Sequence, residues 1–239
     1  MVRTPRGSSA PLSAGEGDGG REEVLEFASQ AVDYVRHSLG VTLEYDSETL
    51  PILDHYLRQI TSAPASPGSD AGRGPEAAAA LVAATAGAYF GEVVRRRLGG
   101  SWHLPSADPA SWRMVLPTGL WFYPVAVAMA AILGPDSDAS PSPAARDLDR
   151  DPDSDDEDDE DFPGDEAEVE GEPAQWDASL QAPPFLRQHV ARVLHGMADV
   201  SEEEYYSLCC RLDTLEHVQA VLAAMTSARR TRPDPDTLD

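Results

Sequence analysis

The sequence predicts an α+β fold that is mostly helical, with a small antiparallel sheet, an acidic disordered linker and C-terminal helices. In several segments the apolar residues recur every three or four positions, which is the period of an amphipathic helix. Short runs within residues 102–122 alternate apolar and polar residues, which is the period of a strand. Residues 136–172 contain 18 acidic residues and two arginines, a composition that buries too little apolar surface to fold.

These patterns divide the chain of 239 residues into five segments. We expect residues 1–20, which are rich in Gly, Ser and Pro, to be disordered. Residues 21–134 form the α+β domain, and residues 135–174 form an acidic low-complexity linker. Residues 175–228 form a C-terminal helical segment that we expect to pack against the first domain. Residues 229–239, rich in Pro and Asp, form a disordered tail.

Apolar periodicity predicts two helices in the first quarter of the chain. The first spans residues 21–39 and ends at Gly40, because glycine commonly terminates helices. A short strand is expected at residues 41–45, where apolar and polar residues alternate. Ser47 is then placed to cap a second helix. One face of this second helix is apolar and contains Leu50, Leu53, Leu57 and Ile60.

A long alanine-rich helix is predicted at residues 76–98, after Pro75, which is a favourable first helical residue. Within it Ala83, Gly87 and Gly91 recur every four residues and form a smooth stripe. Glycine in the middle of a helix costs up to about 1 kcal/mol relative to alanine. We therefore expect another element to approach this stripe closely.

A small antiparallel sheet is predicted after this helix. Its strands fall within residues 102–104, 112–116 and 120–122, and turn residues separate them. Pro124 then begins an apolar helix that continues to Leu133.

The C-terminal segment contains further helical patterns. Residues 185–197 are amphipathic, and Ser201 with Glu204 matches the capping-box pattern at the start of another helix. One helix, or two closely joined helices, then follows with a single apolar face. That face contains Leu208, Leu212, Leu215, Val218, Leu222 and Met225.

The composition excludes several kinds of chemistry. The chain contains no lysine, so lysine Schiff bases and phosphate-binding loops that need a lysine are excluded. The two cysteines, Cys209 and Cys210, are adjacent and cannot link distant segments through a disulfide. The histidines show no zinc-ligand spacing. We expect no cofactor and no metal.

A cytoplasmic location is expected. Residues 1–20 lack the continuous apolar core of a secretory signal. The longest apolar stretch, residues 116–133, is interrupted by Pro and Gly and is interpreted as core, with no membrane association. The net charge of −24 would repel phosphate, and Arg95–Arg97 is the only compact basic cluster, so no nucleic-acid partner is expected.

Two stretches resemble a family of small uncharacterised bacterial cytosolic proteins. They are residues 41–57, with VTLEYDSETL and LDHYL, and residues 87–102, GAYFGEVVRRRLGGSW. The family has a Leu-Asp-Tyr-Ser strand-to-helix junction, a Tyr-x-Gly-Glu-x-x-Arg helix and a following Gly-Gly-x-Trp. The resemblance covers residues 21–133. It implies an α+β fold and a bacterial source, and it transfers no catalytic residue.

The densest charge is a carboxylate run that we call the acidic strip. One interpretation is a self-repelling spacer, and the other is a docking strip for a protein with a basic surface. Both interpretations can hold together. The strip consists of Asp151, Asp153, Asp155, Asp156, Glu157, Asp158, Asp159, Glu160 and Asp161.

The start of the strip partly matches a calcium-loop pattern. Asp149, Asp151, Asp153 and Glu160 occupy positions 1, 3, 5 and 12 of that loop. Ser154 replaces the glycine of the sharp turn, and no amphipathic helices flank the loop closely. Specific calcium binding is therefore not expected.

A second candidate site is a pocket bordered by Glu92, Arg95 and Trp102. Glu92 lies three residues before Arg95 and four before Arg96, which is the spacing of ion pairs within a helix. A structural ion pair is the simpler interpretation. A carboxylate beside an arginine is also able to bind a ligand, although no nucleophile accompanies it.

Taken together, these patterns favour a cytosolic protein-binding protein without catalytic chemistry of its own. An inhibitor, an immunity factor, a chaperone-like partner and a regulator all fit, with the acidic strip attracting a basic protein. The alternative is an enzyme or small-ligand-binding protein that uses a pocket near Glu92, Arg95 and Trp102. The sequence leaves the oligomeric state open.

Overall fold

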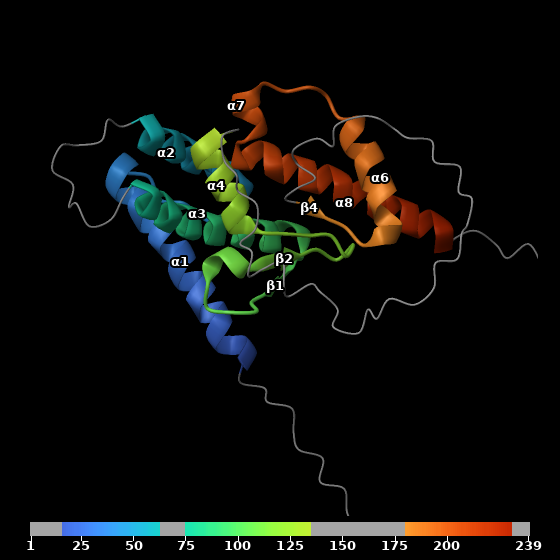
Figure 1. The fold of residues 1–239 in the computed structure, drawn as a ribbon, viewed down its shortest axis with the longest axis horizontal. Helices are drawn as coiled ribbons and strands as arrows, with labels where there is room; N and C mark the ends of the chain where they lie inside the picture. Colours follow the sequence, from blue (N-terminus) through green and yellow to red (C-terminus); the bar gives the residue numbers. More distant parts are fainter. Residues whose placement is uncertain (1–15, 63–74, 135–179, 231–239) are drawn as a thin grey trace, which may run out of the picture.

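The computed structural model describes residues 16–62, 75–134 and 180–230. It is mostly helical, with a four-stranded antiparallel sheet and C-terminal helices, so the predicted α+β class is confirmed (Figure 1). The helices are α1 (Glu16–Leu39), α2 (Leu50–Ser62), α3 (Pro75–Leu98), α4 (Pro124–Leu133), α6 (Pro184–His195), α7 (Glu202–Tyr205) and α8 (Leu208–Arg230). The strands are β1 (Ser101–His103), β2 (Arg113–Val115), β3 (Trp121–Phe122) and β4 (Leu180–Gln181). The predicted linker at 135–174 lies outside the described residues.

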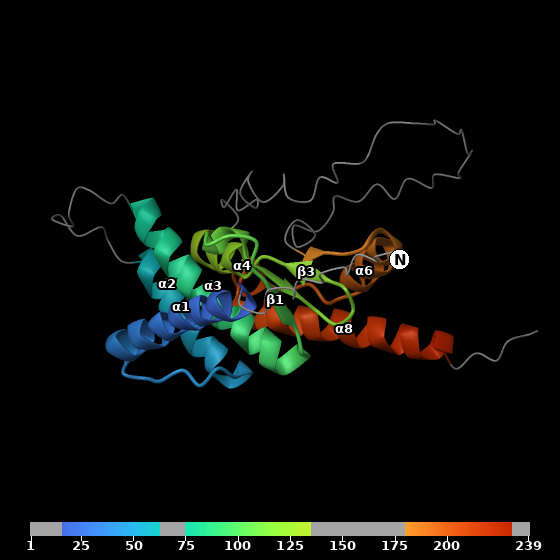
Figure 2. The same cartoon turned by 90° about the horizontal axis from the view of Figure 1, so that it is seen from below.

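Helix α3 lies at the centre of the fold. Every residue from 83 to 94 is buried, so the helix has no solvent-facing side over three turns. Helices α1 and α4 make its most extensive contacts (Figures 1 and 2). A helix that is apolar all round is typical of the interior of a protein, as the alanine-rich sequence of α3 indicates.

Gly87 and Gly91 provide the close approach that the glycine stripe predicts. A Cβ atom on Gly87 would lie 2.6 Å from Val125 Cα and 2.8 Å from the carbonyl oxygen of Pro124. The backbone of α3 therefore touches the first turn of α4. On Gly91, a Cβ atom would overlap the indole ring of Trp102.

The sheet joins the two halves of the chain. Its strand order is β1-β2-β3-β4, and every pairing is antiparallel. Met114 pairs with Phe122, which pairs with Leu180, and all three side chains are buried. The first three strands form where the alternating pattern predicts them. Strand β4 was not predicted. It comes after the acidic residues 136–172 in the sequence and adds two residues to the edge of the sheet.

The C-terminal helices pack against the first domain. Helix α8 contacts α2, α3 and α4, and α6 packs against α8. Gln219 of α8 donates a hydrogen bond to the carbonyl oxygen of Leu98 at 3.0 Å. Arg97 pairs with Glu216 at 2.7 Å, although both side chains are partly exposed. The predicted apolar face of α8 meets the core through Leu208, Leu212, Leu215, Val218 and Leu222.

Several predicted C-terminal boundaries change in the structure. Helix α6 covers most of the predicted 185–197 segment, and α8 is one continuous helix. Ser201 accepts the predicted capping hydrogen bond from the Glu204 amide at 3.3 Å, but the helix that follows has only four residues. Helix α8 continues to Arg230, so the tail predicted from residue 229 begins too early.

The first helix is longer than predicted. Helix α1 begins at Glu16, so residues 16–20, which were expected to be disordered, are helical. Packing explains the difference. A Cβ atom on Gly20 would lie 2.8 Å from Leu104 Cδ1, so this backbone lies against the loop after β1. The tertiary contact outweighs the low helix propensity of the glycines.

The predicted strand at 41–45 is wrong, because residues 41–44 form no regular secondary structure and the chain bends at Tyr45 and Asp46. Tyr45 has a φ of 60°, and its amide donates a hydrogen bond to Tyr89 Oη at 2.8 Å instead of to a neighbouring strand. Asp46 Oδ1 accepts from the Thr49 amide at 2.9 Å. The residue that caps the short helix at Ser47–Thr49 is therefore Asp46, one position before the predicted cap.

The close contact between α3 and α4 predicts that one methyl group added at Gly87 destabilises the fold. We expect Gly87→Ala to reduce the free energy of unfolding by about 1–3 kcal/mol, because the backbone of α4 blocks the added Cβ atom. Gly19 of α1 is the matched control, since a Cβ atom there meets nothing within 4 Å. Gly19→Ala should leave stability unchanged or raise it by up to about 1 kcal/mol. Urea denaturation of both variants measures the difference, and equal stabilities would contradict the close approach.

Candidate functional site

Helix α3 places the carboxylate of Glu92 inside the fold, next to β1. The side chain of Glu92 is fully buried. Arg95 donates to it twice, from Nε to Oε1 at 2.8 Å and from Nη2 to Oε2 at 3.0 Å. Trp102 Nε1 donates to Oε1 at 2.8 Å, and Arg96 Nε lies 3.8 Å from Oε2. The three residues of the predicted pocket therefore lie together, as a hydrogen-bonded group we call the Glu92 cluster.

Local geometry explains why the Glu92 cluster forms. Residues three and four positions apart lie on the same side of a helix, so Arg95 and Arg96 both reach Glu92. Gly91 leaves room for the indole ring of Trp102 to lie against α3. The indole N–H of Trp102 then points at the carboxylate.

The electrostatics of the Glu92 cluster keep its carboxylate ionised. Burial raises the pKa of Glu92, but hydrogen bonds from Arg95 and Trp102 and the charges of Arg95 and Arg96 outweigh burial. The net pKa lies below the usual value of a glutamate. The carboxylate oxygens of Glu92 face protein donors, so the hydrogen bonds of the Glu92 cluster connect α3 to β1. A ligand pocket at this position stays a prediction.

The Glu92 cluster predicts a pH-dependent loss of stability. Because the pKa of Glu92 is lower in the folded protein than in the unfolded chain, its stabilisation is present above the unfolded pKa. That stabilisation is lost as pH falls through the folded pKa. Glu92→Gln should reduce the free energy of unfolding at pH 7 by about 2–3 kcal/mol. The difference from the parent protein should shrink below about pH 4.

Denaturation at several pH values measures this dependence. Glu22→Gln on the exposed face of α1 is the control and should change stability by less than about 0.5 kcal/mol. If the difference in the free energy of unfolding between Glu92→Gln and the parent protein stayed constant across the acid range, the ionised state of Glu92 would be contradicted.

A second buried carboxylate, Asp54 of α2, was not among the predicted site residues. Its Oδ1 accepts from the Leu208 amide at 2.7 Å, and its Oδ2 accepts from the Cys209 amide at 3.1 Å. The first amides of a helix have no partners within the helix. Asp54 therefore caps α8 from α2, across 154 positions of sequence. A signal was present, since Asp54 lies on the same apolar face as Leu50 and Leu57.

The surroundings of Asp54 make the nearby thiol unreactive. Burial raises the pKa of Cys209, and the adjacent Asp54 carboxylate, which accepts a hydrogen bond from the thiol, raises it further. Burial also raises the pKa of Asp54, although hydrogen bonds from Cys209 and the Leu208 amide act in the opposite direction. Because the thiolate is the nucleophilic form of cysteine, this arrangement disfavours covalent catalysis by Cys209.

Removal of the Asp54 cap should weaken the attachment of α8. Asp54→Ala should reduce the free energy of unfolding by about 1–3 kcal/mol, because the buried Leu208 amide and the part-buried Cys209 amide lose their acceptor. Asp54→Asn should cost less, since it keeps one oxygen acceptor. Asp33→Ala is the control, because Asp33 is exposed and pairs with Arg36 at the surface. Urea denaturation measures all three, and equal losses for Asp33→Ala and Asp54→Ala would contradict the cap.

The stability contribution of Asp54 has the opposite pH dependence to that of Glu92. Its pKa is raised in the folded state, so the stabilisation linked to its protonated form is present at acid pH. It is lost as pH rises through the folded pKa. Asp54→Asn removes this dependence, and denaturation of the variant across the acid range should therefore lack it.

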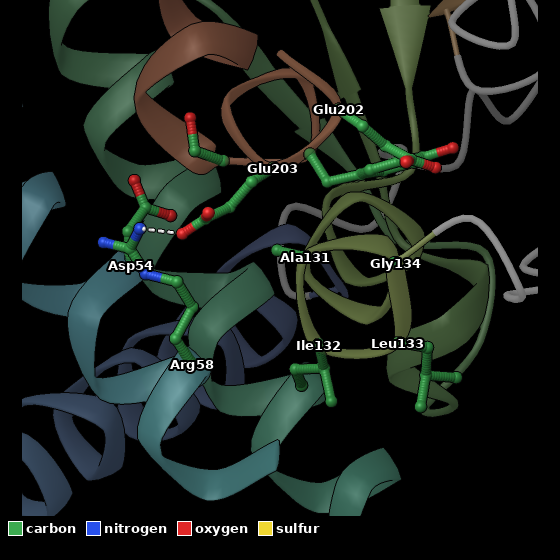
Figure 3. Close-up of a pocket in the computed structure, with 10 residues that line it drawn as sticks. Asp54, Arg58, Ala131, Ile132, Leu133, Gly134, Glu202 and Glu203 are labelled. Carbon is green, nitrogen blue, oxygen red and sulfur yellow. Dashed lines mark hydrogen bonds and ion pairs between the residues drawn. The ribbon is translucent and has the colours of Figure 1, made fainter. Parts of the chain in front are cut away.

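A cleft lies beside Asp54, where α2, the C-terminal end of α4 and the turn that contains α7 meet. Its volume is about 410 Å³. Glu203 pairs with Arg58 at 2.8 Å across the cleft, and Glu202 points away from this pair (Figure 3). A smaller cleft of about 230 Å³ shares four lining residues with it. The larger cleft is lined by Asp54, Arg58, Ala131, Ile132, Leu133, Gly134, Glu202, Glu203, Tyr206 and Ser207.

The acidic strip of Asp151–Asp161 and the partial calcium-loop pattern lie outside the described residues. Within the part of the chain that is described, no group of three or more His, Cys, Asp or Glu side chains is arranged to hold a metal ion.

One described helical segment, Ala77–Leu98, is long and apolar enough to cross a membrane by length and composition alone. In its most apolar window 67% of the residues are buried within the fold. Burial of this kind is also found in core helices of globular proteins.

Comparison with known proteins found no match. No family model, curated protein or solved structure matches this chain.

Proposed function

We propose that this chain is a cytoplasmic protein-binding protein without catalytic chemistry of its own, and that its acidic strip attracts the basic surface of its partner. The observation that carries the proposal is the distribution of charge. Residues 136–172 carry a net charge of −16 of the total −24. A dense anionic segment raises the rate of encounter with a positive surface. An inhibitor, an immunity factor, a chaperone-like partner or a regulator would use such a segment.

The two buried carboxylates also favour binding over catalysis. Glu92 is held by Arg95 and Trp102, and Asp54 is held by two amides of α8. A general acid or base needs a proton-transfer position that a substrate can reach. Glu92 is fully buried and connects α3 to β1, and Asp54, although it borders the cleft, is engaged by two amides of α8. This arrangement gives no support to the alternative of an enzyme or small-ligand binder centred on Glu92.

Neutralising the acidic strip tests the proposal. In the full-length chain, each Asp of the strip is replaced by Asn and each Glu by Gln. Capture of basic proteins from a cell lysate, quantified by mass spectrometry, should be lost in this variant. In the parent protein, capture should weaken steeply as salt rises from 50 to about 300 mM, because screening shortens the range of the attraction.

A scrambled strip of unchanged composition is the matched control. It keeps the charge and should keep the captured proteins, since the attraction depends on charge density and not on order. If the neutralised variant captured the same proteins as the parent, the docking role of the strip would be refuted.

A further inference from the structure

The cleft of about 410 Å³ combines an apolar surface with an acidic rim. The last turn of α4 provides the apolar part, and Leu133 there is 48% exposed. Tyr206 adds a half-buried aromatic ring. Ligand pockets generally measure about 300–1,000 Å³, so this cleft is at the small end and suits one extended side chain better than a cofactor.

The charge of the cleft favours a cation. Glu203 is already paired with Arg58, whereas Glu202 is exposed and forms no ion pair within the described part of the chain. Helix α4 ends in the cleft at Leu133, and its last turn contains no basic residue. The C-terminal end of a helix carries a partial negative charge, which attracts cations. The end of α4 is therefore a second source of negative potential in the cleft, independent of the two glutamates.

These two properties together match an arginine side chain. Its aliphatic stem packs on apolar surface while its guanidinium group stays at the polar rim. The planar guanidinium forms paired hydrogen bonds with a carboxylate and stacks on aromatic rings. Leu133 lines the cleft on its apolar side, where the stem would pack, and Glu202 lines its acidic rim, where the guanidinium group would bind. The ring of Tyr206 already lies 5.6 Å from the guanidinium carbon of Arg211, so the carboxylate of Glu202 is the main contact for the guanidinium group.

We propose that this cleft binds an arginine side chain of the basic partner. The inference rests on the proposed function, because it names the contact that the partner makes with the folded part of the chain. Gly134, which lines the cleft, precedes the segment that contains the acidic strip. The strip begins at Asp151, so at most about 60 Å of chain separates it from the cleft. A partner attracted by the strip is therefore brought within reach of the cleft.

The test is a titration of the ¹⁵N-labelled full-length protein with N-acetyl-arginine methylamide, followed by amide chemical shifts. Saturable shifts should concentrate at residues 131–134 and 202–207. The matching citrulline derivative, which has the same shape without the charge, should bind at least about tenfold more weakly. Glu202→Gln should weaken binding of the arginine probe by about tenfold. Glu22→Gln makes the same charge change on α1 and should leave binding unchanged.

Shifts that do not saturate, equal binding of the citrulline derivative, or unchanged binding by Glu202→Gln would each overturn the inference. Glu202 is exposed, so loss of folding is not expected, and the amide spectrum reports it directly. The strip-neutralised protein should still bind the probe. Suppose that neutralising the strip abolishes capture of basic proteins, but neither the parent nor the neutralised protein binds the arginine probe. Then only the role of the cleft is refuted. If the probe binds but the neutralised protein captures the same proteins as the parent, the role of the strip is refuted instead.

Discussion

The burial of α3 on all sides is the constraint on which the rest of the structure depends. A buried helix must place each polar side chain against a partner inside the protein. Tyr89 Oη does so by contacting Thr49 Oγ1 at 2.7 Å and accepting from the Tyr45 amide. Glu92 does so through Arg95 and Trp102. The polar groups of α3 thereby fix the turn before α2 and the position of β1.

The same constraint explains how two distant parts of the chain form one core. Helix α3 needs cover on several faces, and residues 16–134 do not provide all of it. Strand β4 extends the sheet, α8 covers α2, α3 and α4, and Asp54 holds the start of α8. The acidic segment therefore connects two parts of one fold. Its length and composition can change at little cost in stability, because loop-closure entropy grows slowly with length.

Local patterns in the sequence predicted most of the elements but not the long-range contacts. Helix α3, the first three strands and α4 follow from periodicity, proline and glycine, which act over a few residues. The irregular segment that ends in a bend at Tyr45 was mistaken for a strand, because its conformation depends on Tyr89, 44 positions away. Strand β4 has two residues and no periodicity of its own. The Glu92 cluster was found because helical spacing and a short loop bring its members together.

The cleft could not be predicted in the same way. Its lining residues come from three parts of the chain, and Glu202 and Glu203 appear in sequence only as the acidic first turn of a helix. Asp54 carried a weak signal, as a charged residue on an apolar helix face. The α8 amides that Asp54 caps carry no signal in the sequence, because every helix begins with amides that have no partner within the helix.

In the proposed function, the charge distribution would separate two steps of binding. The described residues, 16–62, 75–134 and 180–230, sum to a net charge of −7, whereas residues 136–172 alone carry −16. At physiological salt, exposed charges act over about 8 Å, so dense charge on one segment attracts more strongly than sparse charge over a larger surface. Such attraction raises the rate of encounter with a basic partner. In the proposed function, selectivity requires a contact of defined shape, and the cleft formed by α2, α4 and the α7 turn is the proposed place of that contact.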